Sequence, residues 1–173
     1  DGYAANYLAS GSINYGIGLG TITPSAGHDS NVSIFSGGGD IRVHGRISEN
    51  SPAGPGSWPT AVLAHAGFDI HAGNTGDITM LGAVTSSALS TGAIGFDLQA
   101  WRESHPANQV LTSAIVANDG DIHIIGRVDS TTKGSLAIGI DGESRNGRAV
   151  RALIATTGTG NITLDGAVDS TDA

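Results

Sequence analysis

Four nine-residue segments of the chain share one alternation of apolar and polar positions. Each begins with Gly-Asp or Gly-Asn and carries glycine at its seventh position: GDIRVHGRI (39–47), GDITMLGAV (76–84), GDIHIIGRV (120–128) and GNITLDGAV (160–168). From the third residue on, every second position is aliphatic, methionine or glycine, which is the period of a strand with one buried face. The pattern predicts four equivalent strands, the cores of four repeats.

Two further apolar runs accompany each repeat core. One precedes it across a glycine-rich turn, as in 32–35, 68–70, 113–117 and 152–155, and another lies between cores, as in 13–19, 61–64, 93–98 and 135–140. About three strands per repeat are therefore predicted.

The repeat cores are unevenly spaced. Their first glycines lie 37, 44 and 40 residues apart, so loops absorb the difference, with 49–59 and 101–109 as the candidates. Forty extended residues would run about 130 Å, so either loops protrude from one coil or each repeat forms two coils. One coil of three strands with side loops is the arrangement we prefer.

Strands that bury one side chain in two need neighbours. Equivalent strands stacked about 4.8 Å apart would place like residues over like and form aliphatic ladders, with Ile41, Ile78, Ile122 and Ile162 as one column. We predict an all-β, right-handed parallel β-solenoid of about four long repeats, forming a single domain over 1–173. The alternative is an antiparallel β-sandwich or jelly roll.

The glycine inside each repeat core falls on the apolar face. These are Gly45, Gly82, Gly126 and Gly166. A missing side chain there predicts a bend or a close approach of other backbone.

Composition narrows the classes of protein. The chain has 173 residues, enough for one domain, with 27 glycines, no cysteine and a formal charge of −8. Such a charge repels phosphate backbones, so a nucleic-acid partner is not expected. Disulfides and thiolate metal sites are excluded. No run of 18 apolar residues exists that could cross a membrane.

Asp119 and Asp121 are the candidate metal ligands. Together with Asn118 they could supply oxygen ligands to calcium, but Asp and Asn in such turns also bond neighbouring backbone amides. No other cofactor is expected. The outward columns of the repeat cores hold at most one acid, Asp165, and glycoside hydrolysis needs a pair of carboxylates. We therefore expect no enzyme activity.

Four apolar side chains are candidates for an interface. Leu81 and Ile125 would stack on the outward face, and Trp58 and Trp101 lie in expected loops. Exposed apolar residues of this kind mark contact surfaces. The alternative for the tryptophans is that their loops fold back and bury them.

The repeat pattern, Gly-Asp/Asn-Ile followed by alternating aliphatic residues, Gly and Ile/Val, resembles the β-helix repeats of filamentous haemagglutinin-like bacterial exoproteins over about 31–170. The resemblance implies a secreted, non-enzymatic structural or adhesive protein of the bacterial cell surface, with the β-helix as a shaft. Both ends of the chain stay repeat-like, which predicts end-to-end self-association or continuation in a longer chain. A host or surface glycan is a candidate partner. The alternative functions are a polysaccharide-processing β-helix enzyme and a carbohydrate-binding β-sandwich.

Overall fold

The structure is a computed structural model, and it describes residues 2–5, 15–19, 32–49, 59–65, 68–86, 92–99, 111–131, 134–141 and 150–170. These residues form thirteen strands and no helix. The strands are β1 (Gly2–Ala5), β2 (Tyr15–Leu19), β3 (Val32–Ser36), β4 (Ile41–Glu49), β5 (Thr60–His65), β6 (Phe68–Ala72), β7 (Ile78–Ser86), β8 (Ile94–Gln99), β9 (Leu111–Ala117), β10 (Ile122–Ser130), β11 (Leu136–Asp141), β12 (Val150–Thr156) and β13 (Ile162–Ser170).

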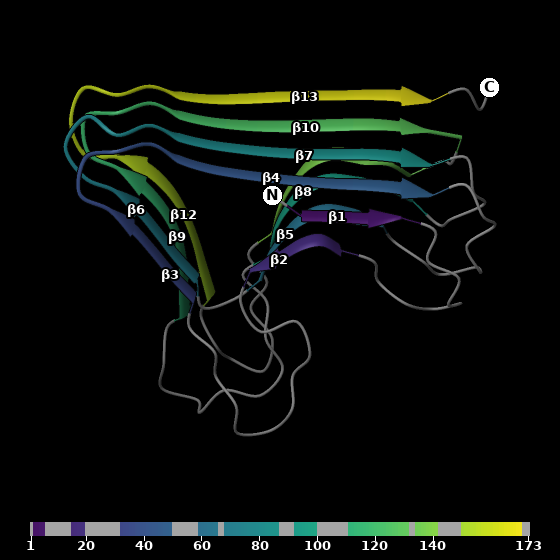
Figure 1. The fold of residues 1–173 in the computed structure, drawn as a ribbon, viewed down its shortest axis with the longest axis horizontal. Helices are drawn as coiled ribbons and strands as arrows, with labels where there is room; N and C mark the ends of the chain where they lie inside the picture. The colour runs from purple at the N-terminus through teal and green to yellow at the C-terminus, as the bar shows by residue number, and fades with distance from the viewer. Residues whose placement is uncertain are drawn as a thin grey trace, which may run out of the picture.

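The strands form three parallel sheets. Sheet A has the order β1-β4-β7-β10-β13, sheet B the order β11-β8-β5-β2, and sheet C the order β12-β9-β6-β3. All pairings between described strands are parallel. Figure 1 shows β13, β10, β7, β4 and β1 following one another down sheet A. The antiparallel sandwich or jelly roll is therefore wrong, and the arrangement is consistent with a β-solenoid.

Each repeat makes one winding of three strands. From one sheet A strand to the next, the chain passes through one strand of sheet B and one of sheet C. This bears out the predicted three strands per repeat and is consistent with one coil rather than two. Trp58, Trp101 and most of both predicted loops lie outside the described residues.

The four repeat cores stack in register. Ile41 pairs with Ile78, Ile78 with Ile122, and Ile122 with Ile162. The first three are buried, whereas Ile162 is 44% exposed. Its assignment to the dry core was wrong because β13 is the outermost strand of sheet A, so no described strand covers its far side.

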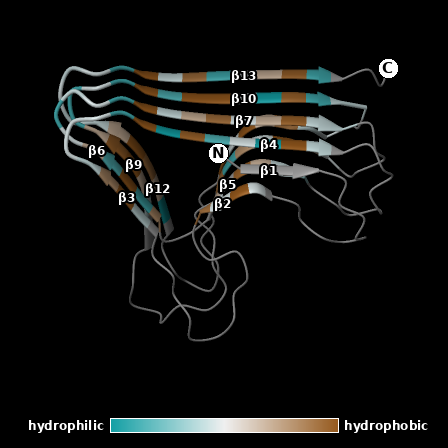
Figure 2. Ribbon diagram, in the orientation of Figure 1, coloured by the Kyte–Doolittle hydropathy of each residue, from teal (hydrophilic) through white to brown (hydrophobic). Residues whose placement is uncertain are grey.

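The inward faces of the three sheets share one core. Sheet A contributes Ile78, Met80, Ile122 and Ile124, and the largest buried side chains of sheets B and C are Phe96 and Phe68. Figure 2 shows the hydrophobic positions of β4, β7, β10 and β13 in line across the sheet. Burying these side chains provides the main driving force for folding, since each fully buried large side chain contributes about 1.5–3 kcal/mol.

The glycine column marks where sheet B meets sheet A. A Cβ on Gly82 would overlap the carbonyl oxygen of Gly95, and a Cβ on Gly126 would overlap that of Ala137. The predicted close approach of backbone is thus confirmed. Beyond the crossing, Val84 and Val128 join a second, smaller core with Ala93.

Candidate functional site

The predicted interface residues Leu81 and Ile125 lie side by side on the outward face of sheet A. They are register partners on β7 and β10, and both are half-buried. Their row continues to His44 on β4 and Asp165 on β13. The structure brings this pair together as predicted, and its role in binding stays a prediction. Trp58 and Trp101 cannot be placed beside it because they lie outside the described residues.

The predicted calcium ligands bond the next winding. The Asp119 Oδ1 accepts the backbone N–H of Thr159 at 3.2 Å. The Asp121 Oδ1 accepts the backbone N–H of Asn161 at 2.7 Å and its side-chain Nδ2 at 3.1 Å. The backbone hydrogen bond from Asn161, followed by the side-chain one, lowers the pKa of Asp121.

The same bond recurs at the equivalent turns. The Asp40 Oδ1 accepts the N–H of Asp77 at 3.2 Å, and the Asp77 Oδ1 accepts that of Asp121 at 2.8 Å. This is the turn chemistry that stood as the alternative to calcium. The described residues hold no group of three or more His, Asp or Glu side chains that could bind a metal ion. Calcium at Asp119 and Asp121 therefore stays a prediction.

An ion pair joins two windings on the outward face of sheet A. The Arg127 Nη2 donates to Asp165 Oδ2 at 2.5 Å, and its Nη1 donates to the Asp165 carbonyl at 2.8 Å and to the Gly126 carbonyl at 3.1 Å. The side-chain hydrogen bond from Arg127 lowers the pKa of Asp165 and raises that of Arg127. Arg127 thus binds a carboxylate that lies one winding further and two positions earlier in the repeat.

Arg46 occupies the position on β4 that Arg127 occupies on β10, but the position of its carboxylate partner holds no acidic residue. Both residues are register partners of Ala83, from opposite sides. Asp165 lies on the strand after Arg127, two positions before the register partner of that arginine. On the strand after Arg46, the same position is occupied by Leu81. Among the described residues, none forms a hydrogen bond or ion pair with the exposed guanidinium of Arg46. Arg42, on the same strand, pairs with Asp40 at 3.0 Å.

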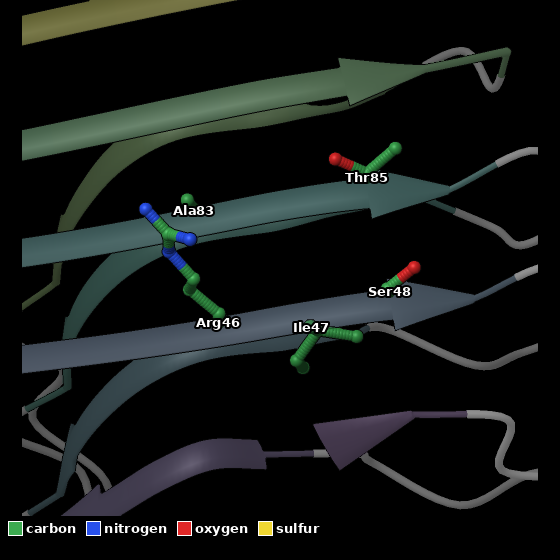
Figure 3. A pocket seen from close by; sticks show the side chains of 5 residues that line it. All are labelled: Arg46, Ile47, Ser48, Ala83 and Thr85. Atoms are coloured by element: carbon green, nitrogen blue, oxygen red, sulfur yellow. The ribbon is translucent and has the colours of Figure 1, made fainter. Parts of the chain in front are cut away.

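A shallow hollow of about 330 Å³ lies at Arg46, lined also by Ile47, Ser48, Ala83 and Thr85. Figure 3 shows the Arg46 side chain reaching from β4 toward β7 near Ala83, with the hydroxyls of Ser48 and Thr85 further along both strands. Ile47 borders the hollow although its side chain is buried on the opposite face of the sheet (Figure 3). A cation beside a small residue and two hydroxyls can bind an anionic group that carries further hydrogen-bonding atoms.

Two features of the outward faces were not apparent from the repeat pattern. Phe35 is 64% exposed on sheet C, with its ring centroid 6.1 Å from that of His71. The alternation in 32–35, which places Phe35 on the same face as Ser33, could have shown it. Asp129 and Asp169 are exposed register partners, missed because the strands extend beyond the nine-residue unit.

The last winding exposes its aliphatic face. Ile162, Leu164 and Val168 of β13 are 44%, 50% and 43% exposed, whereas Ile122, Ile124 and Val128 of β10 are 0%, 0% and 3% exposed. Leu136 and Ile140 of β11 are exposed as well. These side chains belong to columns that are buried in the preceding windings.

Comparison with protein-family models, curated protein sequences and solved structures finds no match to this chain. No helix in the described ranges is long and apolar enough to pass through a bilayer.

Proposed function

We propose that the chain is a right-handed β-solenoid segment of a secreted, non-enzymatic filament or adhesin of the bacterial cell surface. Its function is to form a long, rigid shaft that presents its outer surface for contacts. The resemblance of the repeat cores 39–47, 76–84, 120–128 and 160–168 to filamentous haemagglutinin-like repeats supports the extracellular assignment. Recovery of the native protein from the cell interior alone would contradict it.

One observation carries the proposal. Each winding repeats the preceding one in register, with equivalent aliphatic positions in each column. Because a winding contacts mainly its neighbours, such a stack lengthens by adding windings without changing its cross-section. The aliphatic face of β13 and the outer edges of β11, β12 and β13 present the surface on which another winding would fit. That winding would come from a longer chain or from a second copy.

Gly166→Ala tests whether another winding covers this surface. In the preceding windings a Cβ at the equivalent glycine, as at Gly126, would overlap the strand of sheet B that follows. At Gly166 the nearest described atom to such a Cβ is the Cβ of Ala137, at 3.0 Å. Ala137 must therefore shift slightly, but the larger effect of the methyl group is to occupy the place of the next sheet B strand.

We expect negative-stain images of the native protein to show rods or fibres. If copies of the chain stack, Gly166→Ala shortens the rods or abolishes them. If a longer chain supplies the next winding, the variant lowers that chain's melting temperature well beyond the effect of Gly37→Ala, the matched control, where the added Cβ meets no atom within 4 Å. Compact native particles, or variants that behave alike in both assays, would overturn the proposal.

A polysaccharide-processing enzyme is the second candidate function. The register places Asp129 beside Asp169 on the outward face of sheet A, and two carboxylates about 5 Å apart serve retaining glycosidases. Glycan cleavage by the native protein that is lost in both Asp129→Asn and Asp169→Asn would favour this function over the shaft. Absence of cleavage across acidic and neutral polysaccharides would leave the shaft as the proposal.

A further inference from the structure

The ion pair between Arg127 and Asp165 shows what an arginine at this place in the repeat binds. The guanidinium donates to a carboxylate oxygen and to two carbonyl oxygens on the outward face of sheet A. Guanidinium and carboxylate match in geometry and charge, so an arginine held at a fixed point on a rigid sheet is suited to bind a carboxylate.

Arg46 has the same position on its strand but lacks this partner. Leu81 stands where the carboxylate would be, and no described residue pairs with the Arg46 guanidinium. Its side chain is exposed and borders the 330 Å³ hollow. A carboxylate for Arg46 must therefore come from outside the described part of the chain.

The hollow also contains two hydroxyl groups. Ser48 and Thr85 are register partners two residues beyond Arg46 and Ala83, which is about 7 Å along the strands. That distance suits a single sugar ring, with its carboxylate at Arg46 and its hydroxyls at Ser48 and Thr85 (Figure 3). Asp129, the register partner of Thr85 on β10, places negative charge at the hydroxyl end and favours this orientation of the ligand.

We propose that the hollow at Arg46 binds a carboxylate-bearing sugar of the hexuronate class. The carboxylate pairs with the guanidinium, the methyl group of Ala83 leaves room for the ring, and the two hydroxyls bond ring oxygens. Because the site is open to solvent and has few contacts, the expected Kd for a monosaccharide is about 1 mM. The site would allow the proposed shaft to bind a sugar ligand. Binding itself does not depend on the proposed function, and only its biological role rests on that function.

The test is an NMR titration of the native protein with glucuronate, glucose and acetate at constant ionic strength. We expect glucuronate to bind at least tenfold more tightly than glucose and several-fold more tightly than acetate, with shifts centred on Arg46, Ala83 and Thr85. Equal binding of acetate and glucuronate would overturn the sugar assignment. Shifts centred elsewhere would overturn the site.

Three variants complete the test. Arg46→Gln should weaken glucuronate binding at least tenfold, and Leu81→Asp should do the same because it places an internal carboxylate where Asp165 stands relative to Arg127. Arg151→Gln, at an exposed arginine on β12 of sheet C, is the matched control and should leave binding unchanged. Equal losses in Arg46→Gln and Arg151→Gln would mean general charge attraction and refute the site.

The failure of this proposal can be told apart from the failure of the shaft. Arg46 lies on the outward face of β4, away from the β13 edge, so Arg46→Gln should leave rod length unchanged. Gly166→Ala should leave glucuronate binding unchanged.

Discussion

The crossing of sheets A and B provides a sharp test of the fold through Gly82→Ala. A Cβ at this position would overlap the carbonyl oxygen of Gly95 and lie 2.5 Å from its carbon and 3.1 Å from the backbone nitrogen of Phe96. All three are backbone atoms of β8, which is paired on both sides with β5 and β11. No side-chain rotation can relieve this contact, so sheet B must move away from sheet A.

The displacement of sheet B lowers the free energy of unfolding. Overpacking a core costs about 1–3 kcal/mol, and we expect the upper end, about 3 kcal/mol, because paired backbone has to shift. For a chain of this length each kcal/mol lowers Tm by about 2–4 °C, so the expected drop is about 6–12 °C. Thermal unfolding followed by circular dichroism, together with urea titration, measures both quantities.

The control for Gly82→Ala is Gly37→Ala. A Cβ at Gly37 meets no atom within 4 Å, so the same substitution changes only backbone freedom and should fall within about 1 kcal/mol of the parent protein. Equal melting temperatures for the two variants would refute the close approach of the sheets at the glycine column.

Three further predictions follow from the described contacts. Ile122→Asp should destabilise the protein by about 3 kcal/mol or more, because the charge would lie in the dry core. Phe35→Asp, at a side chain that is 64% exposed on sheet C, should lower the free energy of unfolding clearly less in urea titration, and equal losses would contradict the burial of Ile122. Asp121 and Asp165 have lowered pKa values, so their contribution to stability is present above the unfolded pKa of about 3.9 and is lost as pH falls through the lower folded pKa values. Asp165→Asn should therefore reduce the loss of Tm in acid. An unchanged profile of Tm against pH would count against the ion pair. Because the Oδ1 atoms of Asp119 and Asp121 already accept backbone N–H groups, turn chemistry alone predicts that EGTA leaves Tm unchanged. A fall in Tm that added calcium reverses would establish the calcium site instead.

The repeat cores could be predicted from sequence because strand periodicity is local. Alternation within nine residues shows which side chains share a face, and the recurrence of that unit shows which residues stack, as with Ile78 over Ile41. The glycine at the seventh position could likewise be assigned to a close backbone approach. Which strand makes that approach could not be predicted, because Gly95 and Ala137 lie outside the unit that carries the pattern.

The outward face was less predictable. The pairing of Arg127 with Asp165 joins residues 38 apart and depends on a register that loops of unequal length conceal. Arg46 could not be recognised as an arginine without a carboxylate partner until its neighbour in the next winding was known to be Leu81. Alternation predicts a buried Ile162, but burial also requires a strand that covers β13. Alternation within a strand cannot reveal whether such a neighbour is present.

The sequence by itself determined the repeated strand, its buried face and the columns in which equivalent residues stand, because these follow from side-chain alternation and from self-similarity. Only the tertiary structure decided how the three sheets face one another, which outward charges are neutralised and which aliphatic side chains remain exposed. These properties depend on neighbours contributed by other windings, and such neighbours are distant along the chain although they lie one strand apart in space.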